Sequence, residues 1–266
     1  MYIRKEDISL DVVRDEAHVQ EWWERILYHE MFGLKSMGCN VERRLTHIEI
    51  SNYKKGLPFY NRLLGLNGNL QSVRDILERT QKPISLVLSS ISRSEQEAER
   101  IAQTLGWTHE LSSVVLAREF EKPLESISYE YDVKLIRVDD RETLCKGFEI
   151  FSSFFLKPGE SRESGFARFS HNVISGPHLL AQLAEKPIAI VGSVIMCETA
   201  SVYAGMVDKE HRNTTLLDVL VRELSGFLWG EGVKYIYMKT RNRAVVLYSQ
   251  RMYKFEHIYN ERVYEK

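Results

Sequence analysis

Hydrophobic and polar residues alternate along this chain in two rhythms, which predict helices and strands respectively. After residue 216, apolar residues recur three or four positions apart, the spacing that one buried helix face requires: Leu217, Leu220, Val221, Leu224 and Leu228. Compact apolar runs such as 84–88 and 188–197 are instead typical of buried strands. Both rhythms occur in both halves, so the pattern predicts a mixed α/β (α+β) protein.

The same pattern predicts an order of elements. Helices are expected at 10–33, 70–80, 92–107, 141–155, 166–176, 217–229 and 242–253. Strands are expected at 82–90, 112–120, 131–138, 178–184, 188–197, 199–207, 233–240 and 255–266. Glycine and proline make residues 51–69 rich in turns. From residue 131 on, the order predicts a mixed central sheet.

A loose similarity links the two halves of the chain. The strand, helix and strand expected within 84–119 follow the same plan as those within 235–265. Between the halves, the proline-containing segment 122–131 follows neither rhythm and is typical of a linker. Two copies of one α/β unit account for this linker and for the length of 266 residues, so we expect similar domains in tandem, 1–125 and 126–266.

Charge and composition exclude several classes of function. The chain carries 36 basic and 37 acidic residues, and so lacks the basic surplus typical of nucleic-acid-binding and polybasic membrane-binding proteins. Its N-terminus has no apolar stretch of the signal-peptide type, and its longest apolar run is too short for a membrane-spanning helix. The three cysteines lie far apart, so no zinc site is expected. We therefore expect a cytoplasmic protein without a nucleic-acid, membrane or metal partner.

One stretch places an apolar strand, a polar turn and an amphipathic helix in direct succession: MVDKEHRNTTLLDVLVREL, from Met206 to Leu224. The first four amides of a helix have no partner inside it and carry partial positive charge, so a pyrophosphate fits there. Asn213, Thr214 and Thr215 would equally well cap the helix and occupy those amides with their side chains. The sequence leaves an anion site and a capped structural helix open as alternatives.

This turn, and the order of elements around it, resemble the GNAT superfamily of acyl-CoA N-acyltransferases. That fold has three strands in a meander, followed by helix, strand, helix and strand. The family places an Arg/Gln-x-x-Gly-x-Gly/Ala turn before the first of these helices. Here the turn runs from Arg212 to Leu217, with Thr215 and Leu217 in the places of the glycines.

A second stretch, RNRAVVLYSQRMY, resembles the family's Asn-x-x-Ala-x-x-Leu-Tyr motif. Ala244, Leu247 and Tyr248 stand at matching spacing, whereas Arg241 takes the place of the asparagine and Asn242 comes one position later. Both motifs occur in the order that the family has. The earlier half carries no comparable turn, so it is expected to be a degenerate copy that does not bind the cofactor.

The resemblance implies roles for individual residues. Acetyl-CoA or another acyl-CoA would be bound by Met206, Val207, Arg212, Asn213, Thr214, Thr215, Leu216, Leu217 and Asn242. Among these, Met206 and Val207 would offer strand-edge peptide groups to the pantetheine arm. Tyr248 would protonate the departing thiolate as a general acid. Apart from the resemblance, the proton of the amine needs a base or a water relay: the candidates are Glu198, Asp208, Glu210 and His211, and we expect Glu198. Because glycines let a backbone approach phosphates closely, their replacement weakens this site without deleting its amides.

The implied function is direct transfer of an acyl group, most simply acetyl, from acyl-CoA to an amine on a small molecule or peptide. No Cys/His nucleophile pair suggests a covalent intermediate. Three alternatives stay open at this point. Tyr248 would simply pack against the sheet, the chain would be a non-catalytic GNAT-fold binding or assembly module, or the donor would be a carrier other than free CoA.

Overall fold

The computed structural model describes residues 15–45, 47–52, 61–66, 70–79, 84–91, 93–129, 132–156, 159–203, 205–212 and 215–266, without the side chains of 70 and 93–96. Contacts divide the chain into two compact units. The first holds the chain up to Ala117 together with Lys239–Lys266, and the second holds Arg118–Met238. The C-terminal segment thus packs with the N-terminal one. The predicted domains 1–125 and 126–266 were defined by a repeated order of elements, whereas the compact units are defined by contacts. The domain division therefore stays a prediction.

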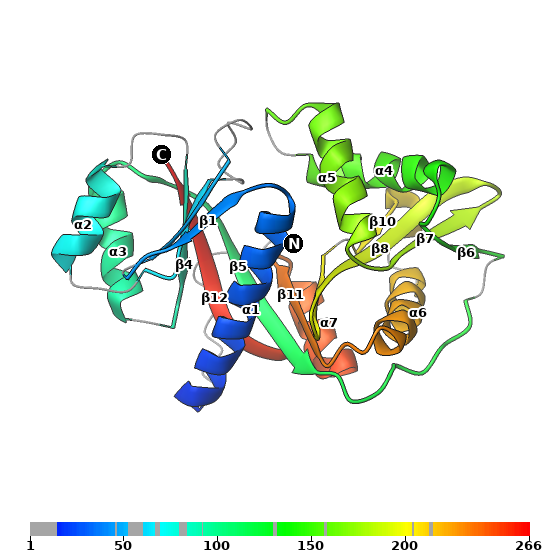
Figure 1. The fold of residues 1–266 in the computed structure, drawn as a ribbon. Coiled ribbons are helices and arrows are strands. Elements are labelled where there is room, and N and C mark those ends of the chain that lie inside the picture. The colour runs from blue at the N-terminus through cyan, green and yellow to red at the C-terminus, as the bar shows by residue number, and fades with distance from the viewer. Residues whose placement is uncertain are drawn as a thin grey trace. The chain divides into compact units, whose positions relative to one another are not determined.

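The first unit is a mixed sheet with helices on both faces. Its helices are α1 (Glu16–Ser36), α2 (Leu70–Arg79), α3 (Arg93–Thr104) and α7 (Arg243–Tyr253). Its strands are β1 (Asn40–Arg43), β2 (Ile48–Ser51), β3 (Arg62–Leu64), β4 (Ser85–Ser89), β5 (Thr108–Glu119) and β12 (Glu256–Glu265). The strand order is β1-β2-β3-β4-β12-β5, and only the β3–β4 pair is parallel. The last strand of the chain therefore lies inside this sheet (Figure 1).

Two apolar cores hold this unit together. On one face α1 packs over the sheet, with Leu34, Ile50 and Leu64 among the buried residues. On the other face α2 and α3 cover β4 and β12, where Leu77 and Tyr264 are fully buried. Because both faces are covered, β4 is buried at every position, which explains its uninterrupted apolar run.

The second unit has a sheet of its own. Its helices are α4 (Arg141–Phe155), α5 (Arg162–Ile174), α6 (Leu216–Gly230) and the short 3₁₀ turn η2 (Lys209–His211). Its strands are β6 (Lys134–Arg137), β7 (His178–Leu183), β8 (Lys186–Met196), β9 (Thr199–Val202), β10 (Met206–Val207) and β11 (Tyr235–Thr240), whose last two residues belong to the first unit. The order is β6-β7-β8-β9-β11, with β10 also on β8, and the β9–β11 pair is parallel.

Aromatic residues fill the core of this second sheet. α4 and α5 lie on one face and α6 on the other (Figure 1). Phe148, Phe151 and Phe169 pack together with ring centroids 4.8–6.3 Å apart. Asp140 starts α4 with a capping box in which its carboxylate accepts from the Thr143 amide at 2.7 Å. This cap, combined with the apolar period, makes α4 coincide with the predicted helix.

The two halves of the chain share one plan. In the first, the antiparallel meander β1-β2-β3 leads through α2 to β4, which is parallel to β3. In the second, the meander β7-β8-β9 leads through α6 to β11, which is parallel to β9. A helix and a long strand follow in both cases: α3 and β5, then α7 and β12. The predicted α/β class with a mixed central sheet is confirmed, and the shared plan supports the tandem copies.

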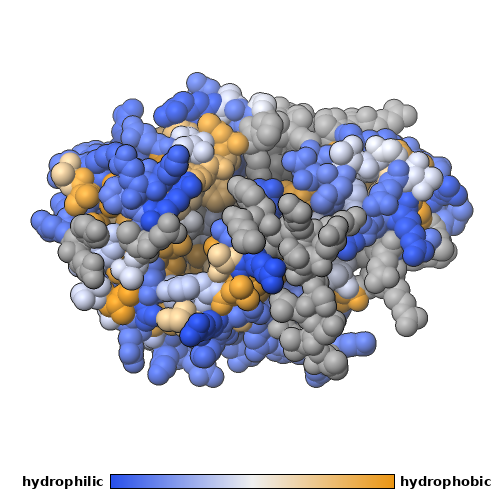
Figure 2. All heavy atoms as spheres, turned by 180° about the vertical axis from the view of Figure 1, so that it is seen from behind, coloured by the Kyte–Doolittle hydropathy of each residue, from blue (hydrophilic) through white to orange (hydrophobic). Residues whose placement is uncertain are grey.

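The surface agrees with a folded chain of ordinary polarity. Hydrophilic residues cover much of the face that Figure 2 shows, with apolar residues in smaller groups among them. None of the helices in the described part of the chain combines the length and the apolar character that crossing a bilayer requires.

Gly192 in β8 gives a direct test of packing in the second unit. A Cβ at this position would lie 2.1 Å from Cδ2 of His178, a fully buried side chain. We expect Gly192→Ala to lower the free energy of unfolding by about 1–3 kcal/mol, because such overpacking forces neighbouring atoms to shift. Urea unfolding followed by circular dichroism measures the change.

Gly226 in α6 is the matched control. A Cβ there meets no atom within 4 Å among the described residues, and the position is a helix interior. Gly226→Ala should therefore stabilise the protein by about 0.5–1 kcal/mol. Equal effects of the two substitutions would show that His178 does not fill the space at Gly192.

Candidate functional site

The predicted strand 199–207 is interrupted by a bulge. Val202 pairs with Ser193, and Met206 pairs with Ile190. The register against β8 therefore shifts by one residue between Val202 and Met206. One extra residue on one strand is a β-bulge, which bends the strand and is frequent beside functional sites. The predicted continuous strand is therefore corrected to two short strands, β9 and β10.

Beyond this bulge the strand leaves its parallel neighbour. β9 pairs with β11 only from Thr199 to Ser201, opposite Tyr235 to Tyr237. β10 pairs with β8 alone among the strands of the described chain. The chain from β9 to β10 thus parts from β11 on the C-terminal side of Ser201. This exposes one edge of β10 to a ligand.

Val207 presents its peptide groups to that edge. The amide of Asp208 donates to Ile188 O at 2.7 Å, so this pair is hydrogen-bonded across β10 and β8. Peptide groups alternate in direction along an antiparallel strand, which turns those of Val207 away from β8. Arg212 occupies part of the edge, because its Nε donates to Val207 O at 3.2 Å. The side chain of Met206, by contrast, does not face this edge. It is buried among the phenylalanines of the core.

The edge leads directly into the N-terminus of α6. Thr215 is the N-cap residue, and its hydroxyl makes no capping hydrogen bond among the described residues. Leu216 is fully buried and Leu217 is partly buried, so both side chains face protein and only their backbone can serve a ligand. The predicted contacts of Asn213 and Thr214 lie outside the described residues. The Thr215 side chain therefore does not compete with a bound anion for the amides at the start of α6.

Charges of both signs surround the turn. Lys186 lies 3.5 Å from the carboxylate of Asp208 and 3.9 Å from that of Glu210. Hydrogen bonds from the backbone of Lys209 and attraction to Lys186 outweigh desolvation and lower the pKa of Asp208. Asp208 and Glu210 also come close to His211, but exposed acidic groups commonly do so without a metal. Arg212 is the cation of the turn closest in sequence to the start of α6.

Two of the predicted residues belong to the first unit. Asn242 caps α7, since its side-chain oxygen accepts from the Ala244 amide at 3.0 Å. Tyr248 is 44% exposed on α7, with its ring in edge contact with Tyr253 at 5.5 Å. An exposed hydroxyl on this helix is compatible with proton transfer, whereas the Asn242 carboxamide already has a structural role.

Glu198 lies at the opposite end of the strand from the turn. It sits in the β8–β9 hairpin, where its carboxylate is ion-paired with exposed Lys234. At about 3.3 Å per residue, the nine residue steps from Glu198 to Val207 span roughly 30 Å. This placement argues against Glu198 as the base for a reaction at the parted strands.

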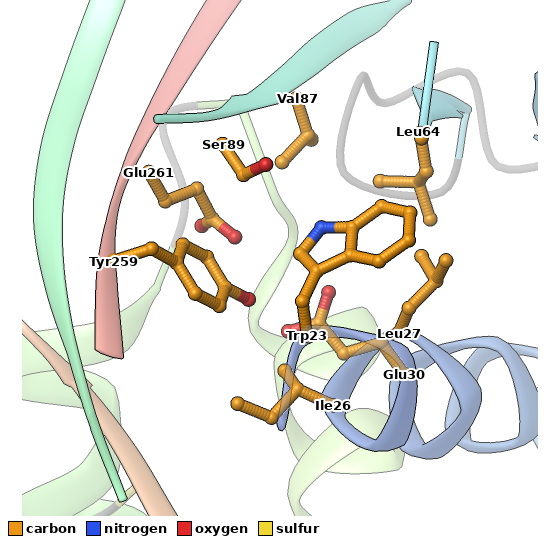
Figure 3. Close-up of a pocket in the computed structure, with 10 residues that line it drawn as sticks. Trp23, Ile26, Leu27, Glu30, Leu64, Val87, Ser89, Tyr259 and Glu261 are labelled. Atoms are coloured by element: carbon orange, nitrogen blue, oxygen red, sulfur yellow. The ribbon is translucent and has the colours of Figure 1, made fainter. Parts of the chain in front are cut away.

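The first unit contains a pocket of a different kind (Figure 3). Side chains from α1, β3, β4 and β12 surround it: Trp23, Ile26, Leu27, Glu30, Leu64, Val87, Ser89, Tyr259 and Glu261, together with Gly65. The pocket opens where the parallel pairing of β3 and β4 ends, after Leu63 and Leu86. It therefore corresponds in the shared plan to the parted strands of the second unit, but Trp23 packs against Gly65 there, 3.4 Å from where a Cβ would stand.

The polar groups of this pocket bind one another. Lys239 Nζ contacts the carboxylates of both Glu30 and Glu261, and Arg62 lies 3.9 Å from Glu30. Burial raises the pKa of Glu261, which Lys239 only partly offsets. For Glu30, burial is outweighed by Lys239 and Arg62, which lower its pKa. Two carboxylates thus face two cations, and the cluster joins α1 to β12.

Comparison with known proteins defines the fold. No protein-family model matches the sequence, and no curated protein is detectably similar to it. Solved structures are similar in fold. A GCN5-related N-acetyltransferase from Kribbella flavida superposes with a TM-score of 0.64 at 14% identity, covering 91% of this chain and 94% of that one.

Two further structures agree. A tandem GNAT protein from the clavulanic acid biosynthesis pathway has a TM-score of 0.59 at 12% identity, over 83% of this chain and 78% of that one. A GNAT-family acetyltransferase from Colwellia psychrerythraea has a TM-score of 0.55 at 11% identity, over 84% and 81%. The chain therefore has the tandem fold of GCN5-related N-acetyltransferases, as the motifs predicted. Identities this low show the fold alone.

Proposed function

We propose that this chain, with its GNAT fold, is an N-acyltransferase that takes an acyl group from acetyl-CoA or another acyl-CoA and transfers it directly to an amine. The observation that carries the proposal is the one-residue register shift against β8 between Val202 and Met206. It separates β10 from β11 and leaves the Val207 peptide groups facing away from β8, just before the N-terminus of α6. An extended pantetheine arm would bind this edge as an added strand, and the pyrophosphate would meet the helix amides.

The chemistry needs one bond formed and one broken. The neutral amine attacks the thioester carbonyl, the amide bond forms, and the CoA thiolate leaves. Tyr248 is the proposed donor of the proton that the thiolate takes up. The proton of the amine passes to water or to a carboxylate. Glu198, because of its place in the β8–β9 hairpin, is a poor candidate for that base.

The competing proposal is a non-catalytic GNAT-fold binding or assembly module. The observation that favours it is the loss of both turn glycines, with Leu217 filling the space beside Gly205, where a Cβ would lie in van der Waals contact, 3.4 Å from its Cδ1. Such packing limits how far the backbone can adjust around a phosphate. The two proposals differ in whether acyl-CoA binds at all.

Binding is tested by thermal unfolding. If the site binds acetyl-CoA, millimolar ligand should raise the melting temperature by several degrees, because a ligand at 100 times its Kd stabilises by about 2.7 kcal/mol. Free adenosine serves as the control, since it lacks the pantetheine and the diphosphate. An unchanged melting temperature with acetyl-CoA would favour the binding module.

Catalysis is tested by release of the thiol with a panel of amines. We expect Tyr248→Phe to lower kcat by about 10²-fold or more, the usual contribution of a general acid, with KM for acetyl-CoA nearly unchanged. Tyr253→Phe is the matched control on the same helix, because its buried ring packs against Tyr248. Equal turnover in wild type and Tyr248→Phe would rule out the acid role.

A further inference from the structure

Phe154 carries a contact that the proposed chemistry does not use. It lies at the end of α4, where its side chain is 44% exposed, and the guanidinium Cζ of Arg212 sits 5.3 Å from its ring centroid. The face of an aromatic ring attracts a cation at this distance. The partly exposed ring thus has the Arg212 cation as a neighbour.

The ring is the second of two anchors on Arg212. The first is the hydrogen bond from Nε to Val207 O, 3.2 Å long. A guanidinium has five N–H donors in a rigid plane, and stacking uses none of them. Together the two contacts restrict where the guanidinium lies, and toward the described residues its terminal nitrogens keep donors for another acceptor. Planar, bidentate donation of this kind suits phosphate oxygens.

We propose that Phe154 is a positioning residue for the phosphates of the acyl-CoA donor, acting through Arg212. The proposal rests on the proposed function and deepens it. Phe154 does not contact the ligand. It holds the guanidinium beside the edge of β10, so that less side-chain freedom is lost when the phosphates bind. Without the ring, Arg212 keeps its charge and its bond to Val207 but loses the contact that fixes its plane.

The test is the Kd of coenzyme A, measured by calorimetry so that no acceptor is needed. Phe154→Leu should weaken binding about two- to fivefold, the range expected for an exposed cation–π contact. Phe154→Tyr keeps the ring and should bind like wild type. Because the position is exposed, neither substitution removes core packing.

Phe227→Leu is the matched control. Phe227 in α6 is 37% exposed, and Arg137 lies over its ring at 5.5 Å, so it loses the same kind of contact elsewhere in the second unit. The Kd of the Phe227→Leu variant for coenzyme A should equal that of wild type. In an Arg212→Met background, Phe154→Leu should cause no further loss, because the residue through which it acts is gone.

The outcomes separate the two proposals. The positioning role is wrong, while the proposed function stands, if wild type binds coenzyme A and Phe154→Leu has the same Kd. The same holds if Phe154→Leu raises the Kd as much in the Arg212→Met background as in wild type. Failure of Phe154→Tyr to restore binding also overturns the role. If wild type does not bind coenzyme A, the proposed function fails and the positioning role fails with it.

Discussion

Replacing Lys239 by methionine should destabilise the first unit by about 3–5 kcal/mol at pH 7, since removing one partner of a buried ion pair leaves uncompensated charge. Lys239 contacts Glu30 on α1 and Glu261 on β12, whose side chains are 16% and 10% exposed. Methionine keeps most of the apolar stem of lysine but not its charge. Of the two cations that pair with these carboxylates in the described residues, Arg62 would then remain, 3.9 Å from Glu30.

This penalty should shrink as the pH falls. In wild type, burial lowers the pKa of Lys239, but attraction to Glu261 and Glu30 outweighs this and raises it. In the variant, both carboxylates lose that cation, so burial and mutual repulsion raise their pKa values above 4.5, the ordinary value. A carboxylate with a raised folded-state pKa loses stability as pH rises and regains it as pH falls. The gap between wild type and variant should be smaller at pH 5 than at pH 7.

Lys234→Met is the matched control for this experiment. Lys234 also pairs with a carboxylate, that of Glu198, but the two side chains are 62% and 52% exposed. Exposed pairs of this kind contribute about 0–1 kcal/mol. Urea unfolding at both pH values measures all three proteins. A loss below 1 kcal/mol for Lys239→Met would show that the cluster is hydrated and does not hold α1 to β12.

Local signals explain which elements could be predicted from the sequence. α4 combines an apolar period with the Asp140 capping box, and the helix was predicted at its observed limits. α5 begins four residues before its predicted start because Ser161 caps it, accepting from the Ser164 amide at 3.1 Å. Gly165 precedes the predicted start of this helix, but it lies within α5, where a Cβ would come 2.3 Å from Leu156. It is a packing glycine, and sequence alone does not distinguish the two uses.

The strands that sequence reasoning missed are those defined by their neighbours. β1, β2 and β3 have only three or four residues each, too few for a period to show. The register shift between Val202 and Met206 exists only relative to β8, so the sequence pattern predicts one continuous strand over 199–207. The Arg212 turn was predicted from its motif. Its partner Phe154 is 58 positions earlier, and no spacing rule connects the two.

A buried histidine should make the second unit sensitive to acid. His178 is fully buried, with Nδ1 2.9 Å from Gly176 O and Nε2 2.7 Å from the Tyr203 hydroxyl. Since a carbonyl only accepts, Nδ1 carries the proton and Nε2 accepts from Tyr203. Burial lowers the pKa of His178 to about 4 from the ordinary 6.5, although the bond to Gly176 opposes the change.

The sign of the effect follows from this lowered pKa. Below pH 6.5 the unfolded chain binds a proton at His178 that the folded chain does not accept until about pH 4. Stability from this group is therefore complete above pH 6.5 and is lost as pH falls, by about 3 kcal/mol at pH 4. In His178→Gln, the part of the pH dependence of the unfolding free energy that comes from His178 should disappear. This holds however much stability the substitution removes at pH 7.

The slope is the quantity to measure, because the glutamine variant will also lose packing around Gly192 at every pH. Free energies of unfolding at pH 7.5, 6 and 5 should converge between wild type and His178→Gln as the pH falls. His18→Gln, the same substitution at a 40% exposed side chain in the other unit, is the control for the replacement itself. Parallel pH profiles for wild type and His178→Gln would mean that His178 titrates alike in the folded and unfolded chains, and that the Tyr203 contact does not keep it neutral.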